Sequence, residues 1–121
     1  MTGLHLTADL AGCDARRPPM HDMAALRALC LAAVAASGLQ AVGELFHRFP
    51  GPGGITGMVL LAESHLAVHT WPERGAVTLD VYVCNLQGDN SPRAEVLLQR
   101  LCAAFEPAHM AVQRLARKIG P

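Results

Sequence analysis

The sequence predicts an α+β fold, a two-layer sandwich in which helices cover one face of a mainly antiparallel sheet. Three observations support this prediction. The expected elements follow the order strand, helix, a run of strands, helix, strand along 121 residues. The connections inside the run have the length of hairpin turns, which favours antiparallel pairing. No internal repeat and no linker divides the chain, so residues 1–121 are expected to form one domain.

The first strand and the first helix are expected in the N-terminal third. Apolar and polar residues alternate over 4–10, "LHLTADL", as they do in a half-buried strand. The prolines at 18–19 then break the chain. Asp22 can cap a helix that runs to about Ser37, and Gly38 is well placed to end it. The apolar face of this helix would carry Leu26, Leu29, Cys30 and Ala33.

The run of strands occupies the middle of the chain. We expect strands over 40–49, 56–63 and 65–70, and the composition of 56–63 predicts burial on both faces. The loop at 50–54, "PGPGG", supplies glycines for backbone conformations that other residues avoid. A turn follows at 71–75, "WPERG".

The last strand of the run and a second helix complete the pattern. Residues 76–84 alternate, and a helix over 90–105 has Ser91 as its cap and Pro92 in its first turn. Residues 108–115 can form a final strand. The inward side chains of 76–84 are Val77, Leu79, Val81 and Val83.

The opposite face of 76–84 carries Thr78, Asp80, Tyr82 and Cys84. A single layer of helices does not need to cover this face. It therefore meets solvent, lines a site or contacts another subunit.

Composition excludes several classes of protein. Ten basic and ten acidic residues cancel, and no basic run suggests nucleic acid. The most apolar stretch, 24–36, is too short to span a membrane, and the N-terminal residues lack the basic region of a secretory signal. The four cysteines are widely spaced, which argues against a zinc ribbon and against disulfides. We therefore expect a cytoplasmic protein.

The segment 62–73, "AESHLAVHTWPE", concentrates reactive side chains. His65 and His69 could share a metal ion on a helix, but on a strand they lie roughly 13 Å apart, which is too far. A Ser-His pair for hydrolysis lacks the G-x-S-x-G turn. A third interpretation is that Ser64 attacks its own backbone at Glu63, with a histidine moving protons. Spacing alone leaves these readings open beside a plain strand that carries histidines by chance.

Four segments, taken in order, resemble the bacterial and archaeal S-adenosylmethionine decarboxylase family. They are "GLHLTADLAGCD" at 3–14, "FHRF" at 46–49, "ESHLAVHTWPE" at 63–73 and "LDVYVC" at 79–84. The cysteine follows the second histidine of the motif by fifteen residues. The resemblance covers nearly the whole chain, and the chain length agrees.

The resemblance implies a proenzyme that cuts itself between Glu63 and Ser64, into a beta chain of residues 1–63 and an alpha chain of residues 64–121. In the family, the serine hydroxyl attacks the preceding carbonyl and turns an amide into an ester. Elimination and hydrolysis then leave a covalent pyruvoyl group at the serine position, with release of ammonia. His69 matches the histidine that assists proton transfer in this processing.

The resemblance also implies the roles of the remaining site residues. The substrate amine forms a Schiff base with the pyruvoyl group, which accepts electrons as carbon dioxide leaves. Cys84 matches the acid that returns a proton to the carbanion. Phe49 and Trp71 match the aromatic pair that stacks the adenine, and Glu73 matches the carboxylate that holds the ribose hydroxyls. No metal is implied.

Similar enzymes are homodimers, in which two sandwiches pack sheet against sheet as four layers. Such a dimer would explain the uncovered polar face. The product of the reaction, decarboxylated S-adenosylmethionine, is the aminopropyl donor for spermidine synthesis.

The sequence departs from the family pattern at several positions. The loop at 50–57 is one residue longer, and Thr56 stands where many relatives have a serine, which predicts slower processing. Residues 74–77 and Asn85 also differ, and they lie around the expected substrate pocket.

These departures leave the substrate open. Homologues decarboxylate ornithine or arginine by the same pyruvoyl chemistry. A further alternative is a homologue that no longer cuts itself and acts only as a binding or regulatory partner. The retention of Ser64, His69 and Cys84 counts against that alternative.

Overall fold

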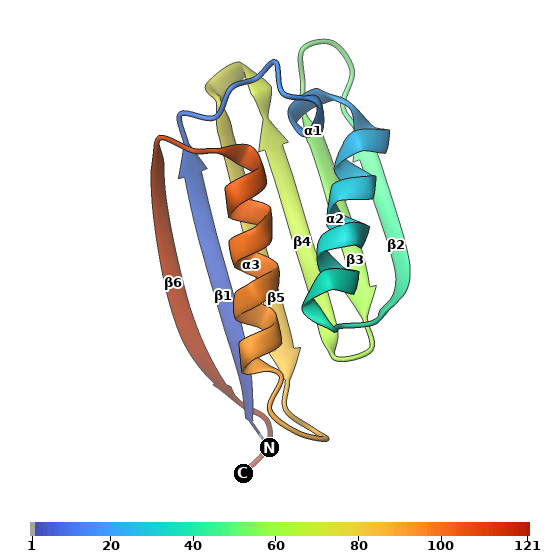
Figure 1. The fold of residues 1–121 in the computed structure, drawn as a ribbon, viewed down its shortest axis with the longest axis vertical. Helices are drawn as coiled ribbons and strands as arrows, with labels where there is room; N and C mark the ends of the chain where they lie inside the picture. The colour runs from blue at the N-terminus through green and yellow to red at the C-terminus, as the bar shows by residue number, and fades with distance from the viewer. Residues whose placement is uncertain (1) are drawn as a thin grey trace.

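The protein forms a six-stranded sheet that is covered on one face by helices, as a computed structural model of residues 2–121 shows (Figure 1). The α+β two-layer prediction is confirmed. The elements in order are β1 (Thr2–Ala11), α1 (Pro18–His21), α2 (Met23–Ser37), β2 (Ala41–Arg48), β3 (Ile55–Leu61), β4 (Ser64–Trp71), the 3-10 helix η1 (Pro72–Arg74), β5 (Ala76–Cys84), α3 (Ser91–Phe105) and β6 (His109–Lys118).

The strands lie in the order β2-β3-β4-β5-β1-β6, and every neighbouring pair is antiparallel. Strands β2 to β5 form a meander of hairpins, as expected. The N-terminal strand β1 lies between β5 and the C-terminal strand β6. Helices α2 and α3 lie side by side on one face, with α2 over β2 and β3 and α3 over β5 and β1 (Figure 1).

The hydrophobic core lies between these helices and the sheet. The alternation predicted for β5 is confirmed, because its four inward side chains are at most 3% exposed. Helix α2 begins and ends where expected. The Asp22 carboxylate accepts a hydrogen bond from the Ala24 N–H at 3.0 Å, and Gly38 ends the helix with a φ of 84°.

The prediction that β3 is buried on both faces is wrong. The residues directed toward the helices, such as Val59, are buried, but Met58 is 41% exposed and Leu60 is 49% exposed. The protein has one helix layer, so the other face of this apolar strand has no cover within the chain. Apolar composition alone does not distinguish a second helix layer from a contact with another subunit.

The start of α3 also differs from the expectation. Asn90, rather than Ser91, occupies the cap position, and its side chain makes no capping hydrogen bond. The Ser91 N–H donates to the Asp89 carboxylate at 3.0 Å, and this contact holds the pKa of Asp89 below its usual value. The start of α3 is therefore held by the Asp89 side chain in the preceding loop, and Ser91 does not act as the cap that the sequence suggested.

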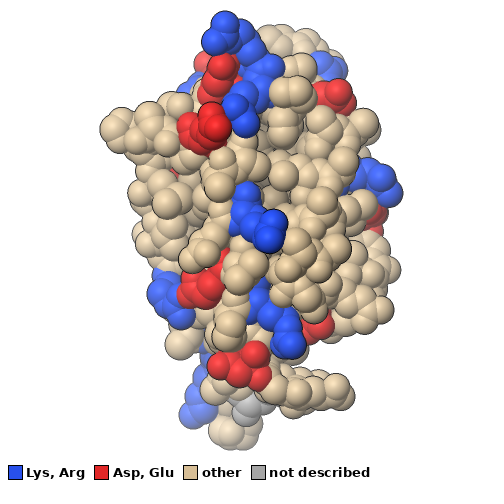
Figure 2. Space-filling model, viewed as in Figure 1, with Lys and Arg blue, Asp and Glu red and all other residues tan. Residues whose placement is uncertain are grey.

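Acidic and basic side chains are interspersed over the helix-covered face, and neither sign forms a separate field there (Figure 2). Within residues 2–121, none of the helices has both the length and the apolar character needed to cross a membrane.

Candidate active site

Strand β4 carries the reactive segment along its whole length. Ser64 is its first residue, beside the turn that joins β3 to β4, and Trp71 is its last. His69 lies near the Trp71 end, where it pairs with Thr56 of β3. The predicted site residues therefore fall into two groups. The junction end comprises Glu63, Ser64 and Cys84, and the aromatic end comprises Phe49, Thr56, His69, Trp71 and Glu73.

At the junction end, a backbone hydrogen bond holds the peptide carbonyl of Glu63. The Cys84 N–H donates to this oxygen at 2.9 Å. A donor at this position stabilises the negative charge that develops when a nucleophile attacks the carbonyl carbon. Ser64 has a φ of 156°, a value that residues with a side chain rarely adopt. The carbonyl is thus positioned, and the backbone beside the Ser64 hydroxyl is strained.

A polar cavity of about 380 Å³ opens at this end of the sheet. Within it, the Glu63 side chain has a buried oxygen, Oε2, that finds no hydrogen-bond partner among residues 2–121. The residues that line the cavity are Gly38, Ala62, Glu63, Cys84, Leu86, Gln87, Asn90 and Arg93.

Cys84 differs from the other cysteines in its surroundings. It is half-buried and follows Tyr82 on the face that the helices leave uncovered. Burial raises the pKa of the Cys30 thiol to about 12, and it also raises the pKa of Cys13 and of Cys102. Those three thiols are protonated at neutral pH and packed in the core, which leaves Cys84 as the accessible cysteine thiol.

At the aromatic end, Thr56 and His69 form a hydrogen-bonded pair. Thr56 Oγ1 lies 3.1 Å from His69 Nδ1. The His69 ring stacks on Trp71, with ring centroids 5.8 Å apart and planes inclined by 25°. The hydroxyl at position 56 is therefore placed to orient the imidazole.

The loop before β3 brings Phe49 to the same end. A β-carbon at Gly54 would lie 1.7 Å from the Thr70 carbonyl oxygen, so only glycine fits there. The next residue is anchored as well, because the Ile55 N–H donates to Thr70 Oγ1 at 3.0 Å. This packing leaves a cavity of about 240 Å³. Its lining includes Phe49, Thr56, Trp71 and Glu73.

Within one chain, the two ends do not meet. Ser64 and His69 are five residues apart on the same strand, which is roughly 16 Å at about 3.3 Å per residue. Proton transfer through a hydrogen bond needs a separation of about 3 Å between heavy atoms. The structure brings together Thr56, His69 and Trp71, and separately Glu63, Ser64 and Cys84, but not the two groups. The rise of about 3.3 Å per residue, which gave the distance between His65 and His69 in the sequence analysis, gives the distance between Ser64 and His69 in the same way. This separation could therefore have been calculated from the sequence.

A third polar cluster, which the sequence analysis missed, lies midway along the uncovered face. Asp80 Oδ2 lies 2.9 Å from His5 Nε2 and 3.6 Å from His65 Nε2. Tyr82 packs against both imidazole rings. The residues come from β1, β4 and β5, so no sequence motif joins them.

The ligand atoms of His5, His65 and Asp80 lie within 4.8 Å of one another, a spacing that a metal ion could bridge. The surroundings favour a hydrogen-bonded cluster instead. Arg117 Nη1 lies 3.3 Å from His5 Nδ1, and a guanidinium can only donate. His5 therefore carries its proton on Nε2, where Asp80 accepts it, and the nearby positive charge opposes a cation.

Comparison with known proteins identifies relatives of the whole chain. Residues 4–118 match the family model described as S-adenosylmethionine decarboxylase. The S-adenosylmethionine decarboxylase proenzyme of Prochlorococcus marinus (strain MIT 9313) is 40% identical over 103 residues, which cover 85% of this chain and 80% of that protein. The proenzyme of the same description from Pyrococcus furiosus is 34% identical over 109 residues, which cover 90% of this chain and 75% of that protein.

A solved structure shows the same fold. The crystal structure of the adenosylmethionine decarboxylase from Aquifex aeolicus superposes with a TM-score of 0.87 at 36% sequence identity. The match covers 98% of this chain and 92% of that one.

Proposed function

Because the chain belongs to the S-adenosylmethionine decarboxylase family, we propose that it is a self-processing decarboxylase with a covalent pyruvoyl group made from Ser64. It would convert S-adenosylmethionine to decarboxylated S-adenosylmethionine, the aminopropyl donor for spermidine synthesis. The observation that carries the proposal is the hydrogen bond from the Cys84 N–H to the Glu63 carbonyl, beside the strained backbone of Ser64. A metabolic activity of this kind suits the cytoplasm.

The junction residues supply the parts that self-cleavage needs. The Ser64 hydroxyl attacks the Glu63 carbonyl carbon, and the Cys84 N–H stabilises the oxyanion. The C–N bond then breaks, which leaves an ester between the two residues. Elimination releases the Glu63 carboxylate, and hydrolysis releases ammonia. The products are residues 1–63 and residues 64–121 with a pyruvoyl end.

The pyruvoyl group would act as the electron sink as carbon dioxide leaves the substrate. Cys84 lies beside the position where the group forms, on the uncovered face, and its thiol can give a proton to the substrate carbon. Cys84 would thus act in two steps. Its backbone N–H would stabilise the oxyanion during self-cleavage, and its thiol would protonate the substrate carbon during decarboxylation.

Because His69 lies too far from Ser64 of its own chain to exchange a proton with it, a second copy of the chain would have to supply the imidazole. We propose a homodimer in which the uncovered sheet faces of two copies pack against each other. Its two-fold axis would lie between the two sheets, perpendicular to the strands, at the height of the middle of β4. Such an axis reverses the strand direction, so the junction end of one copy lies opposite the aromatic end of the other. The sheets of packed sandwiches lie about 10 Å apart, which the side chains span.

The uncovered face has the composition expected of such an interface. Leu45 and Met58 are opposite each other on β2 and β3, and they are 78% and 41% exposed. Leu115 of β6 is 56% exposed on the same face. Exposed apolar side chains gathered on one sheet face mark a contact surface. The dimer would be a four-layer assembly with its helices outside.

The aromatic end fits S-adenosylmethionine. Phe49 and Trp71 offer aromatic faces for an adenine ring, and the Glu73 carboxylate can accept hydrogen bonds from ribose hydroxyls. The same groups attract a sulfonium cation. Ornithine and arginine have no ring system that would use two aromatic faces.

Mass spectrometry and a decarboxylation assay test the proposal together. We expect two fragments of 63 and 58 residues (121 minus 63), the second with a blocked N-terminus. We expect carbon dioxide from S-adenosylmethionine and none from ornithine or arginine. A wild-type protein that turns over substrate as a single uncut chain would rule out the pyruvoyl mechanism. Release from ornithine or arginine alone would change the substrate and leave the mechanism in place.

A further inference from the structure

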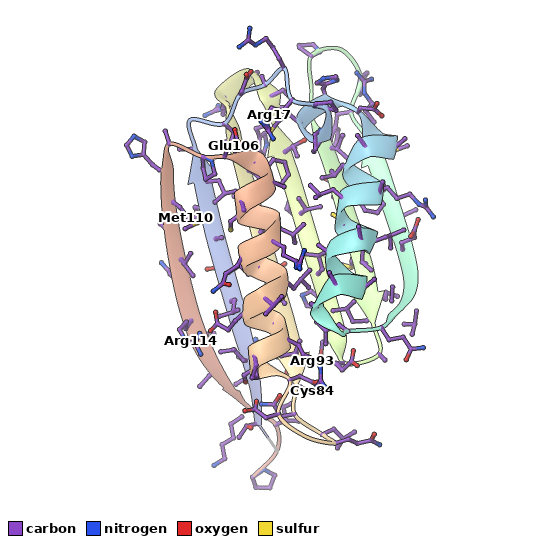
Figure 3. All side chains as sticks on the ribbon, in the orientation of Figure 1. Arg17, Cys84, Arg93, Glu106, Met110 and Arg114 are labelled. Carbon is purple, nitrogen blue, oxygen red and sulfur yellow. The ribbon has the colours of Figure 1, made fainter. Side chains whose placement is uncertain are left out.

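A chain of three hydrogen bonds connects Arg93 to the carbonyl at the Glu63–Ser64 junction. Arg93 Nη1 donates to Asn90 Oδ1 at 2.9 Å, and Asn90 Nδ2 donates to the Cys84 carbonyl at 3.0 Å. The Cys84 N–H donates in turn to the Glu63 carbonyl at 2.9 Å. Figure 3 shows Arg93 at the start of α3 beside Cys84 at the end of β5. The guanidinium is therefore part of the same network as the bond to be cut.

Arg93 also packs against the end of the neighbouring helix. A β-carbon at Gly38, which ends α2, would lie 3.3 Å from Arg93 Nε and 3.6 Å from its Cδ. The negative end of the α2 dipole lies at this point and favours a cation. Gly38 and Asn90 together hold the guanidinium at the rim of the junction cavity.

The charges of this cavity will change when the chain is cut. Glu63 and Arg93 are the charged residues in its lining. Before the cut, Glu63 contributes one carboxylate, whose buried Oε2 finds no partner among the described residues. After the cut, Glu63 also carries the new α-carboxylate, so that two negative charges lie on one residue opposite one cation.

We infer that Arg93 binds the carboxylate that leaves Ser64 during self-cleavage and holds it at Glu63 afterwards. The inference rests on the proposed function. In the elimination step, the Ser64 Cα proton passes to His69 of the second copy, and a double bond forms between Cα and Cβ. The Cβ–Oγ bond breaks, and its electron pair stays on the oxygen that departs with the Glu63 carbonyl. Arg93 stabilises the charge that develops on this carboxylate, to which a guanidinium can donate two parallel hydrogen bonds.

The test follows the cut in freshly synthesised precursor. Wild type, Arg93→Gln and Arg93→Lys are made in a cell-free system, and samples taken over time are divided. One half is treated with hydroxylamine, which cleaves the ester and leaves Ser64 with a free amine. Intact mass then separates precursor, ester and pyruvoyl-ended fragment. Arg100→Gln, on the same helix two turns further along, is the matched control.

We expect Arg93→Gln to form the pyruvoyl fragment roughly 10- to 100-fold more slowly than wild type. This is the decrease in rate expected when the transition state loses one hydrogen bond to a charged group. The ester should accumulate, because attack on the carbonyl does not need Arg93. Arg93→Lys should recover part of the rate, and Arg100→Gln should match wild type. In the uncut Ser64→Ala background, Arg93→Gln should lower the unfolding temperature by only a few degrees, the scale of one lost interaction at a helix end.

Two results would overturn the inference. One is pyruvoyl formation by Arg93→Gln at the wild-type rate. The other is slow processing without ester, because that pattern places Arg93 before the elimination or in the fold alone. An uncut wild-type chain is a separate result, and it would refute the proposed function itself.

Discussion

Ser64 and His69 lie on the same strand, five residues apart, with the proposed cleavage site at one end and the imidazole at the other. A straight strand keeps them roughly 16 Å apart. The same strand geometry that keeps them apart in one chain lets two antiparallel copies place each serine opposite the other copy's histidine. The proposed dimer would therefore complete the site as well as cover an apolar face.

Complementation between two inactive variants tests this arrangement. Ser64→Ala and His69→Ala should each remain almost wholly uncut when expressed alone. Expressed together in equal amounts, they should form mixed dimers that hold one intact composite site. With random pairing in a two-fold dimer, about a quarter of all sites should be cut and active. The fraction of cut chain, measured by mass spectrometry, provides the readout.

A site built within a single chain predicts something different. Neither variant would then contain both residues, and co-expression would restore nothing. If the site is composite, by contrast, the cut chains should derive only from the His69→Ala polypeptide, because it is the one that retains Ser64. A mass tag on one of the two chains identifies it.

Cys84→Ala should separate processing from turnover. The backbone N–H that holds the Glu63 carbonyl remains in the variant, so we expect at least partial cutting. Turnover should fall by roughly 10² or more, the scale for loss of a general acid. The assay is carbon dioxide release per pyruvoyl-ended chain. Cys102→Ala, which removes a buried thiol on α3, is the control. Full activity in Cys84→Ala would exclude the Cys84 thiol from the mechanism.

Thr56→Val should slow the cut without loss of the fold. The variant keeps the shape of the side chain but removes the hydrogen bond to His69 Nδ1, which measures 3.1 Å. Loss of one such bond predicts a decrease of roughly 2- to 10-fold in the processing rate. Thr56→Ser should process at least as fast as wild type. Equal half-lives for the valine and serine variants would show that the hydroxyl has no role.

Trp71→Ala should weaken substrate binding. Loss of the stacking face is worth about 1–2 kcal/mol, so KM for S-adenosylmethionine should increase on the order of 10-fold. Trp71→Phe should recover much of this loss because it keeps an aromatic face. An unchanged KM in the alanine variant would place the adenine elsewhere.

Gly54→Ala should disturb the aromatic end through packing alone. The new β-carbon would lie 1.7 Å from the Thr70 carbonyl oxygen, so the loop that carries Phe49 must move. We expect a destabilisation of about 1–3 kcal/mol and a higher KM. Gly43→Ala in β2 is the matched control, because its β-carbon would lie 3.6 Å from the nearest atom. Thermal unfolding followed by circular dichroism compares the two variants.

Local patterns in the sequence predicted the six strands and the two long helices, but not the short helices α1 and η1. The roles of the site residues were inferred from the family resemblance, and they stay predictions. The alternation of 76–84 predicted the buried face of β5, and Asp22 and Gly38 predicted the ends of α2. These signals arise from contacts between residues that are close in sequence. The motif from Glu63 to Glu73 likewise falls on one strand and the turn after it.

Relations between distant segments could not be predicted. Nothing local places β1 between β5 and β6, and so nothing local brings His5 to Asp80 or Arg117 to His5. The hydrogen bonds from Arg93 to Asn90 and from Asn90 to Cys84 depend on the path of the loop before α3. The burial of β3 was overestimated because an apolar composition does not reveal whether the chain itself covers both faces of a strand, and here the outer face, with Met58 and Leu60, is left exposed.

The position of β1 limits how the two products of the proposed cut could separate. This strand belongs to residues 1–63, while its neighbours β5 and β6 both belong to residues 64–121. β3 and β4, which come from different products, also remain paired beside the cut. Residues 1–63 and residues 64–121 are therefore interleaved in the sheet. Separating them would break three strand pairings, β1 with β5, β1 with β6 and β3 with β4. If the chain cuts itself as proposed, the broken backbone should leave the folded structure unchanged: the cut protein should unfold as a single cooperative unit, and dilution alone should not separate its two parts.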